Sequence, residues 1–423
     1  MTIPDWLPLD NAAKIFPAVY NRERTSVFRL TAEIDRPVRY STLLKALKIA
    51  QERVPYFTVQ LRRGFFWYWL DYESPGIPVM ADLQPPCRSF RFSNRQQPQV
   101  RVLVRDNQIS CEFFHALTDG SGGMIFLRIL IAAYAKTAGI PLPESEAGLL
   151  NSTCGQEETE DAYNRYFDPN LPAPPQIKKA YHLPFPKRQK PRYQVLPIEI
   201  PATLVKKKAK EHKLTVTEYL VSVYFWAMQE AYHQFPNRGY LKRRSVIRIQ
   251  IPVNLRNFFQ SKTLRNFAIF VVPEIDMRLG HYSFDEICRV VHHRVQLETD
   301  PKLLKRVIYR NVRNEKSFFI RIIPLVIKNK VLSFFFFRSG ISIYSGLITN
   351  LGRIEFTGEF GNFVRRMRFY PPPPDHTKIA IGMITLNQKM VITFGSITDS
   401  KALEKLFTGF LKREGIPVKL INP

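Results

Sequence analysis

One histidine, His115, has neighbours that suit a general base. It follows the apolar pair Phe113-Phe114 and precedes a segment rich in glycine. A neutral imidazole, with an ordinary pKa of about 6.5, can accept a proton at neutral pH and return it within the same reaction cycle. Asp119 stands directly before Gly120, a position typical of a helix N-cap, where a carboxylate accepts backbone N–H bonds and stays ionised. We therefore expect acid–base chemistry from His115 and a structural role for Asp119.

Three segments must position this histidine. Residues 100–104 and 108–114 are two apolar runs separated by a polar turn, a pattern that predicts a β-hairpin ending at His115. From residue 120 to residue 138, apolar side chains recur at helical spacing, which predicts a helix facing the core. The histidine is therefore expected on a strand-to-helix turn.

Three sequence motifs carry a resemblance to a known family. Residues 115–120 read HALTDG, which resembles the HxxxDG motif of the acyl-CoA-dependent acyltransferases that share the chloramphenicol acetyltransferase and condensation-domain fold. The likeness is strongest to the alcohol acetyltransferases. Two later segments stand where that family would have them: PVNLR at 252–256, continuing to SKTLRNF at 261–267, and TNLG at 349–352. A phenylalanine replaces the first of the two adjacent histidines that many relatives carry, which weakens the likeness to condensation domains more than to acetyltransferases.

The resemblance implies a fold and a mechanism. The fold would be α/β, in an α+β two-layer form, with two chloramphenicol-acetyltransferase-like halves forming a pseudo-dimer around a central channel. His115 would deprotonate the acceptor, which would attack the thioester without an acyl-enzyme, and Asp119 would pair with Arg256. The other residues implied are Gly120, as a structural residue of the site, and Ser121, Thr349 and Asn350, as residues of the channel or the substrate site.

The chain length favours two halves. At 423 residues, the chain exceeds the size at which a single hydrophobic core usually keeps growing. We predict an N-terminal half over residues 1–140 that carries the HxxxDG motif, a proline-rich crossover over 141–192, and a C-terminal half over 193–423. The crossover also contains an acidic patch at Glu157, Glu158, Glu160 and Asp161.

The charge balance calls for an anionic partner. The chain has 62 Lys and Arg against 36 Asp and Glu, a formal net charge of +26. Coenzyme A, an acidic carrier protein and an anionic lipid surface are the candidates, whereas the scattered charges and the lack of a recognised motif argue against nucleic acid. Lysines crowd one predicted helix and could contact the phosphates of coenzyme A or simply form a solvated face: Lys206, Lys207, Lys208 and Lys210.

Two aromatic or basic segments leave alternatives open. Residues 65–69 (FFWYW) predict either a central strand or one wall of the acceptor pocket. Residues 303–337 mix cations with apolar runs that are too short to span a bilayer. That segment could lie in a membrane interface, or form a core helix with snorkelling cations.

The remaining patterns bear on location and cofactors. Four irregularly spaced cysteines indicate neither a disulfide framework nor a zinc site, and residues 1–10 do not resemble a signal peptide. His281, His292 and His293 lack the spacing of a metal motif. We therefore expect a monomeric cytoplasmic protein with no metal or cofactor, and leave open a peripheral contact with the inner face of the membrane.

These patterns lead to one expected function and one alternative. The expected function is transfer of an acyl group, acetyl or another short chain, from acyl-CoA as co-substrate to an alcohol or amine, with His115 as general base. The alternative is a noncatalytic protein of the same fold that docks on an anionic membrane or a carrier protein. The sequence identifies neither the acceptor nor the acyl chain, and does not separate coenzyme A from a carrier-bound donor.

Overall fold

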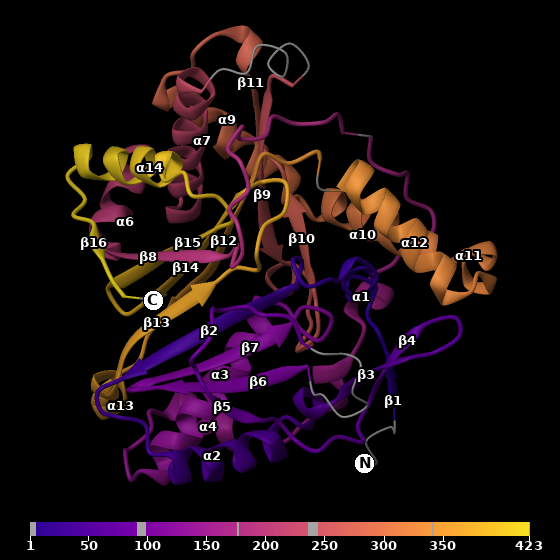
Figure 1. Ribbon diagram of the computed structural model, residues 1–423, viewed down its shortest axis with the longest axis vertical. Helices are drawn as coiled ribbons and strands as arrows, with labels where there is room; N and C mark the ends of the chain where they lie inside the picture. The colour runs from indigo at the N-terminus through magenta and orange to yellow at the C-terminus, as the bar shows by residue number, and fades with distance from the viewer. Residues whose placement is uncertain (1–5, 91–98, 176, 236–243, 341, 423) are drawn as a thin grey trace.

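The computed structural model describes residues 6–90, 99–175, 177–235, 244–340 and 342–422 (Figure 1). Two sheets, each covered by helices, form the lower and upper parts of the molecule in Figure 1. Residues 1–5 and 423, at the ends of the predicted halves, lie outside the described ranges, so the prediction about a signal peptide rests partly on residues that the structure does not describe.

The N-terminal sheet carries the motif histidine at the end of a central strand. The predicted hairpin is confirmed, since two antiparallel strands run over residues 100–105 and 108–114. Apolar side chains from both of these strands are fully buried in the N-terminal core. In sheet order the strands are β13 (Val364–Tyr370), β2 (Val27–Ile34), β7 (Gln108–Phe114), β6 (Val100–Arg105) and β5 (Val79–Ala81).

Helices cover one face of the N-terminal sheet (Figure 1). The predicted motif helix is confirmed as α3, residues 120–137, which ends one residue before the predicted end. It lies against α2 and buries most of its side chains, because apolar residues occur on all of its faces. The elements of this layer are α2 (Tyr40–Arg53), the short helix η1 (Pro55–Thr58), α3 (Gly120–Thr137) and α4 (Glu144–Asn151).

The C-terminal sheet has eight strands and its own hydrophobic core. In sheet order they are β10 (Ala268–Val271), β9 (Val246–Asn254), β12 (Gly346–Ile354), β14 (Ile379–Leu386), β15 (Lys389–Ser396), β8 (Gln194–Pro201) and β16 (Lys419–Leu420), with β11 (Glu274–Asp276) also paired to β9. Its helices are α6 (Ala202–Glu211), α7 (Val216–Gln234), α9 (Phe284–Glu298) and α14 (Ala402–Arg413). Capping boxes at Thr215 and Ser283 begin α7 and α9.

The C-terminal part of the chain contributes one strand to the N-terminal sheet. β13 belongs to the C-terminal part of the sequence, yet it pairs antiparallel with β2 at the edge of the N-terminal sheet. Phe369 and Tyr370 of β13 are accordingly buried in the N-terminal core. The short helix α13 (Gly358–Phe363) precedes β13 in the chain. After β13, the chain returns to the C-terminal sheet as β14.

The crossover contains little regular structure, as its prolines predict. Only α5 (Ala162–Arg165), the short helix η2 (Gln156–Thr159) and α4 interrupt it among the described residues. Tyr163 of α5 is buried in a third, smaller core together with Leu255 and Phe267. The crossover therefore packs beside the segment that carries the second predicted motif.

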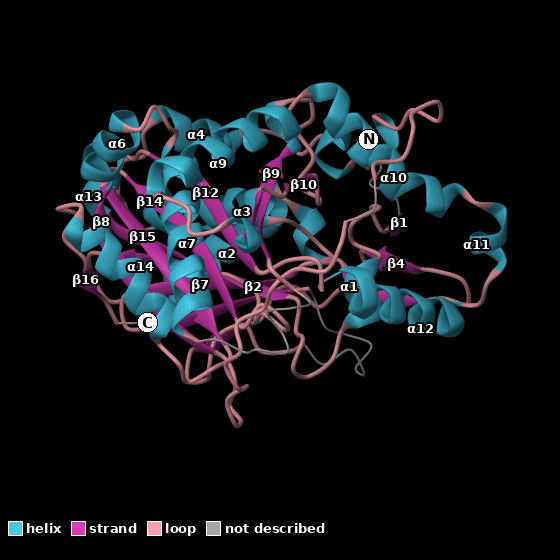
Figure 2. Ribbon diagram, turned by 90° about the horizontal axis from the view of Figure 1, so that it is seen from above, coloured by secondary structure: helices cyan, strands magenta, loops and turns pink. Residues whose placement is uncertain are grey.

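The basic segment predicted as one helical stretch is divided into three helices. They are α10 (Pro301–Lys316), α11 (Phe318–Ile322) and α12 (Leu325–Phe335), followed by η5 (Phe336–Gly340). The last break is at Pro324, which cannot continue a helix from the preceding turn. Figures 1 and 2 show that α11 and α12 project from one side of the molecule. In the part of the chain that the structure describes, we find no helix with the length and apolarity needed to cross a membrane.

The prediction of a central strand for the aromatic run 65–69 is confirmed only for its second part. The strand β4 begins only at Tyr68, and Phe65 and Phe66 form the exposed turn that joins it to the preceding strand. These strands belong to a small separate sheet in which β4 is the middle strand, so Tyr68 and Trp69 lie in a central strand, whereas Phe65 and Phe66 do not. The alternative, one wall of the acceptor pocket, stays a prediction. The strands of this sheet, in order, are β1 (Trp6–Pro8), β4 (Tyr68–Asp71) and β3 (Gln60–Arg63).

Candidate active site

Aromatic side chains and the backbone hold the ring of His115 in place. The residue follows β7, and its N–H donates to the carbonyl oxygen of Ser26 over 2.8 Å. Its ring stacks on Phe16 with 4.5 Å between centroids and meets the edge of Phe28 at 5.3 Å. The side chain is only partly buried, so the ring is oriented by packing and still reaches solvent.

A hydrogen bond from the C-terminal half selects the tautomer of His115. Its Nδ1 lies 3.0 Å from Oδ1 of Asn266. The amide nitrogen of Asn266 donates to Oδ2 of Asp10 over 3.2 Å, which turns Oδ1 toward the imidazole. Because that oxygen can only accept, Nδ1 must carry the proton and Nε2 keeps its lone pair. Nε2 makes no hydrogen bond to the residues that the structure describes, so it is available to an incoming proton donor.

Burial shifts the pKa values of His115 and Asp10, the two residues at the ends of this chain of hydrogen bonds. It lowers the pKa of His115 below its ordinary value, against the opposing charge of Asp119, so the imidazole is neutral at pH 7. It also raises the pKa of Asp10 to about 6, although Arg265 acts in the opposite direction. Both groups are therefore in the required form at neutral pH: the imidazole as a base and the Asp10 carboxylate as an acceptor.

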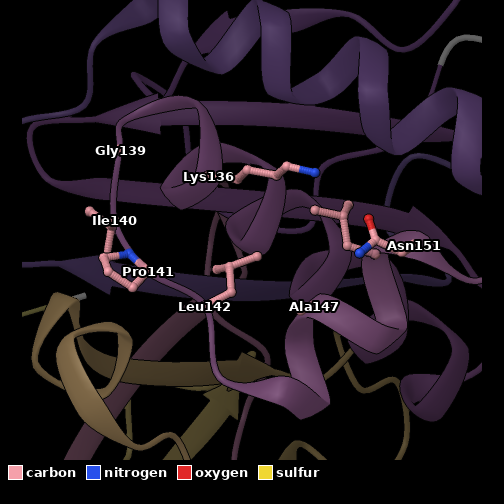
Figure 3. A pocket seen from close by; sticks show the side chains of 8 residues that line it. Lys136, Gly139, Ile140, Pro141, Leu142, Ala147 and Asn151 are labelled. Carbon is pink, nitrogen blue, oxygen red and sulfur yellow. The ribbon is translucent and has the colours of Figure 1, made fainter.

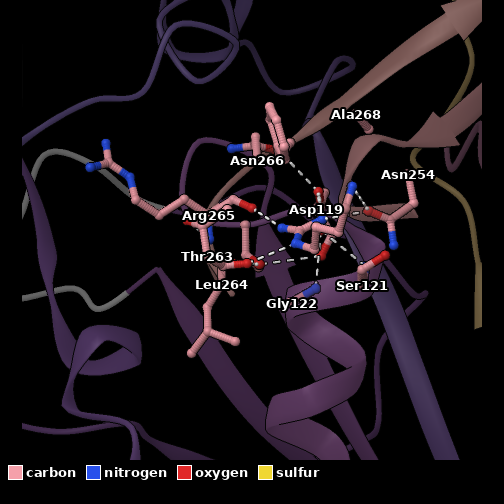
Figure 4. Close-up of polar contacts among 12 residues, drawn as sticks. Asp119, Ser121, Gly122, Asn254, Thr263, Leu264, Arg265, Asn266 and Ala268 are labelled. Atoms are coloured by element: carbon pink, nitrogen blue, oxygen red, sulfur yellow. Dashed lines mark hydrogen bonds and ion pairs between the residues drawn. The ribbon is translucent and has the colours of Figure 1, made fainter. Parts of the chain in front are cut away.

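Asp119 joins the two halves of the molecule (Figure 4). Its Oδ1 accepts the N–H groups of Ser121 and Gly122 at 3.1 and 3.0 Å, as expected of the N-cap of α3. Its Oδ2 accepts from the N–H of Phe267 and from Nη1 of Arg256, both over 2.9 Å. Burial raises the pKa of this carboxyl, but the Arg256 guanidinium and the N–H donors outweigh it, and the pKa lies below its ordinary value. The carboxylate is saturated with donors, which suits a structural role.

Arg256 makes the contact with Asp119 that the resemblance implies, and it also organises its own loop. It lies in the short helix η3 (Leu255–Asn257) at the end of β9. Its Nε donates to the carbonyl oxygen of Thr263 over 2.8 Å, and its Nη1 donates to Oδ1 of Asn254 over 3.0 Å. These bonds of the guanidinium therefore stabilise the loop that carries Asn266.

The acidic patch of the crossover holds the same loop from the other side. The carbonyl oxygen of Glu158 accepts the N–H of Leu264 over 2.7 Å, and that of Glu160 accepts the hydroxyl of Thr263 over 2.8 Å. The Glu158 carboxylate also pairs with Arg53 of α2 at 2.7 Å. The patch thus connects the loop to the N-terminal half.

Two glycines in the first turn of α3, Gly120 and Gly122, lie close to the C-terminal half. A Cβ on Gly122 would lie 2.2 Å from the carbonyl oxygen of Leu264 and 2.2 Å from the hydroxyl of Thr118. A Cβ on Gly120 would lie 2.5 Å from Cδ2 of Leu351. Packing therefore requires glycine at position 122, where a Cβ would meet backbone, whereas a Cβ at position 120 would have to displace the end of the Leu351 side chain. Leu264 and Leu351 are thus the residues of the C-terminal half that pack against these two glycines.

The third predicted motif reaches the site through Leu351. β12 has an irregular register after Asn350, where Gly352 adopts a φ of +87°. The Asn350 side chain donates to the hydroxyl of Thr217 over 3.0 Å and accepts the N–H of Gly352 over 2.9 Å. These bonds hold the strand at the position where Leu351 meets α3. Ser121 and Thr349 are both partly buried, on the first turn of α3 and on β12.

The predicted lysines do not join this group. Lys206, Lys207 and Lys210 are exposed on α6, which packs against β8 and α7. In the C-terminal sheet, β12, β14 and β15 separate β8 from β9, which leads into the Arg256 loop. Lys208 pairs instead with Glu211 and Glu414, each at 3.2 Å. A role for α6 in binding coenzyme A stays a prediction without a described contact to the site.

A surface pocket of about 360 Å³ lies elsewhere, beside the C-terminal end of α3 (Figure 3). Since α3 has 18 residues at 1.5 Å each, about 25 Å separate this pocket from the N-cap at Asp119. It is therefore distinct from the candidate site. The residues that line it are Lys136, Gly139, Ile140, Pro141, Leu142, Ala147, Leu150 and Asn151.

Sequence reasoning missed two polar members of the site. Asn266 lies inside a segment that the resemblance covers, but nothing in the sequence indicates that its side chain faces His115. Asp10 is far from both in the chain, and no motif surrounds it. Only the tertiary structure connects Asp10, Asn266 and His115.

Comparison with solved structures gives the fold. Polyketide synthase associated protein 5 from Mycobacterium tuberculosis matches over 96% of this chain and 98% of its own, with a TM-score of 0.58 and 14% identity. TRI101 of F. sporotrichioides, solved with coenzyme A and T-2, matches over 99% of this chain and 100% of its own, with a TM-score of 0.61 and 10% identity. The first condensation domain of the calcium-dependent antibiotic synthetase matches over 99% of both chains, with a TM-score of 0.61 and 12% identity.

The chain has the condensation-domain fold. The similarity extends over both halves, so the expected α/β class and paired-half architecture are confirmed. No family model and no curated protein sequence matches this chain. At 10–14% identity, the likeness to these structures concerns the fold.

Proposed function

We propose that this protein is an acyltransferase that moves an acyl group from acyl-CoA to a hydroxyl or amine, with His115 as the general base. The observation that carries the proposal is the 3.0 Å contact of His115 Nδ1 with Oδ1 of Asn266, whose amide nitrogen donates to Asp10. This arrangement favours the proton on Nδ1 and the lone pair on Nε2. Nε2 makes no hydrogen bond to the described residues, so its lone pair is left to accept a proton.

The chemistry follows from that lone pair. Nε2 of His115 takes the proton of the acceptor hydroxyl as the oxygen attacks the thioester carbonyl. The tetrahedral intermediate collapses with cleavage of the carbon–sulfur bond, and the imidazolium returns its proton to the departing thiolate. The base is regenerated, no acyl-enzyme forms, and atoms and protons balance without a metal or cofactor.

Asp119 and Arg256 have a different task in this proposal. They carry opposite charges that are already paired and saturated with hydrogen bonds, so neither is free to exchange a proton. They keep α3 and the Asn266 loop together, and through that loop they orient His115. Ser121, Thr349 and Asn350 are proposed as residues of the substrate channel.

The choice of donor rests on two observations. TRI101, which has this fold, was solved with coenzyme A. The chain itself carries a formal net charge of +26, which suits a donor with several phosphates. A short acyl chain and an alcohol acceptor of the alcohol-acetyltransferase type are part of the proposal on the strength of the HxxxDG resemblance.

The test uses the full chain with acetyl-CoA and a panel of alcohols and amines, with release of free thiol as the readout. His115→Ala is expected to lower the rate by about 10²–10⁴-fold, the usual contribution of a positioned base. His293→Ala, at an exposed histidine on α9, is the matched control and should keep full activity. Full activity in His115→Ala would overturn the mechanism, and binding of coenzyme A without turnover of any acceptor would favour the noncatalytic alternative.

A further inference from the structure

Helix α12 presents its apolar residues to solvent. The outward positions follow helical spacing, and three of their apolar side chains, Val326, Ile327 and Phe335, are 51, 51 and 58% exposed. Val331 and Phe334 continue the same face. A surface helix of a soluble protein normally has the opposite arrangement, with its apolar stripe toward the core.

The inward side of α12 carries polar side chains beside the buried Leu325. Lys328 is buried, donates to the carbonyl oxygens of Phe66 and Arg321 at 3.1 and 3.2 Å, and lies 3.5 Å from the ring centroid of Trp67. Asn329 donates to the Tyr68 hydroxyl over 2.8 Å. These bonds fix the rotation of the helix, so its apolar face is held outward.

A second element extends this surface. The N–H of Leu325 donates to the carbonyl oxygen of Phe65 over 2.8 Å, which joins the start of α12 to the β3–β4 turn. Phe65 is 71% exposed, and its neighbour Phe66 and Ile322 of α11 are also exposed. Two segments distant in the sequence therefore form one apolar surface, which we name the α12 face: Phe65, Phe66, Ile322, Val326, Ile327, Val331, Phe334 and Phe335.

Cations border the α12 face and carboxylates are rare. Arg63, Arg321 and Lys330 are exposed beside it. The sequence contains no Asp or Glu between Glu315 and Glu355, and Glu315 itself contacts Lys14 and Asn11. The chain segment that carries α11 and α12 thus has charges of one sign, which complements an anionic partner.

We propose that the α12 face docks on the anionic surface of a lipid bilayer. Figures 1 and 2 show that α11 and α12 project from the body, so a flat partner can reach these helices. Apolar side chains would enter the interface, while the bordering cations would contact the phosphates of the headgroups. The helix lies on the surface and does not cross the membrane. This inference is independent of the proposed acyl transfer, although it would place the enzyme beside hydrophobic acceptors.

Vesicle sedimentation of the full chain tests the proposal. Binding is expected to vesicles that contain phosphatidylglycerol, and to be at least about tenfold weaker with phosphatidylcholine alone, since each surface cation adds to the attraction. The double variant Val326→Asp/Phe335→Asp should lose at least about tenfold in affinity for the anionic vesicles. Its control is Leu279→Asp, at a leucine that is 80% exposed at a different part of the surface, which should bind normally.

Two double charge reversals distinguish binding by the α12 face from an effect of the overall positive charge. Arg321→Glu/Lys330→Glu should weaken binding to the anionic vesicles, whereas Lys45→Glu/Lys48→Glu, on exposed positions of α2, should not. Equal losses in both pairs, unchanged binding by the Asp variant, or no binding of the unaltered protein would overturn the proposal. A lipid-free dimer that the Asp variant abolishes would also overturn it and assign the face to a second copy. Thermal unfolding of every variant verifies that it is folded.

Discussion

Oδ1 of Asn266 lies 3.0 Å from Nδ1 of His115, so a residue of the C-terminal half sets the tautomer of a base that the N-terminal half carries. Neither half contains a complete acid–base apparatus. The proposed chemistry therefore depends on how precisely the halves meet.

Removing the Asn266 side chain tests this dependence. Asn266→Ala frees the imidazole to carry its proton on either nitrogen, and we expect kcat to fall by about 10- to 100-fold with little change in KM, because substrate contacts remain. Asn266→Asp keeps an acceptor and adds a negative charge, so it should retain more activity and raise the pKa of His115. Steady-state kinetics over a pH range measure both effects. Equal kcat in the Ala variant and the unaltered protein would contradict the assigned tautomer.

Asp10 should act on His115 through Asn266. In Asp10→Asn, an NH₂ group can face the amide of Asn266, which can then turn its own NH₂ toward His115 and reverse the tautomer. We expect kcat to fall by about tenfold or more while coenzyme A still binds. Asp35→Asn, at an exposed carboxylate paired with Arg36, is the control. Loss of activity in both variants would point to a general effect of charge.

The lowered pKa of His115 predicts the acid limb of the pH–rate profile. Since burial favours the neutral imidazole, kcat/KM should stay level as the pH falls to about 6.5 and decline only as it passes through the lowered pKa. The same shift affects stability: the folded state binds fewer protons than the unfolded state in this window, so folding stability is present above about pH 6.5 and decreases below it. A kinetic pKa above about 6.5 would exclude His115 as the titrating base.

The buried Asp119–Arg256 ion pair should contribute more to the free energy of unfolding than ion pairs on the surface do. Arg256→Ala leaves a buried carboxylate without its counter-charge, at a cost of about 3–5 kcal/mol in the free energy of unfolding. Urea denaturation measures this, with Arg278→Ala, at an exposed pair with Asp276, as the control that should change little. In the double variant Asp119→Asn/Arg256→Ala the loss should be smaller than the sum of the single losses. Additive losses would show that the two side chains are energetically independent.

Gly122 should tolerate no side chain. The Cβ of Gly122→Ala would collide with the carbonyl oxygen of Leu264, and we expect a loss of about 1–3 kcal/mol in stability together with lower activity. Gly148→Ala is the matched control, because it lies in α4 with open space around its Cα and should be neutral or stabilising by about 0.5–1 kcal/mol. Equal stability of the two variants would mean that the approach of α3 to Leu264 is not tight.

Local patterns in the sequence predict the local parts of this site. The hairpin before His115 and the helix after Asp119 are found within a residue of their predicted bounds, because alternation and helical periodicity record which faces are buried. The contact of Asp119 with Arg256 follows from the resemblance. The link from Asp10 through Asn266 to His115 has no periodic or motif signal, since it depends on how distant segments pack.

The apolar character of a segment does not always predict whether its side chains are buried. The run at Phe65 and Phe66 has the apolar character of an interior strand, yet both side chains are exposed at a turn. In α12, hydrogen bonds made by Lys328 and Asn329 help to set the orientation of the helix, which leaves most of its apolar residues outward. Composition alone cannot distinguish an apolar segment that faces a core from one that faces outward.

The strand β13 has a consequence for any attempt to divide this molecule. It closes the N-terminal sheet beside β2, although about 170 residues of the other half precede it in the chain. A fragment made only of the first half would leave the β2 edge bare and would invite intermolecular strand pairing. A fragment made only of the second half would contain β13 without β2, the strand with which it pairs. The two halves are thus not separable modules, and recombination or truncation at the crossover should yield aggregates and no working half-enzyme.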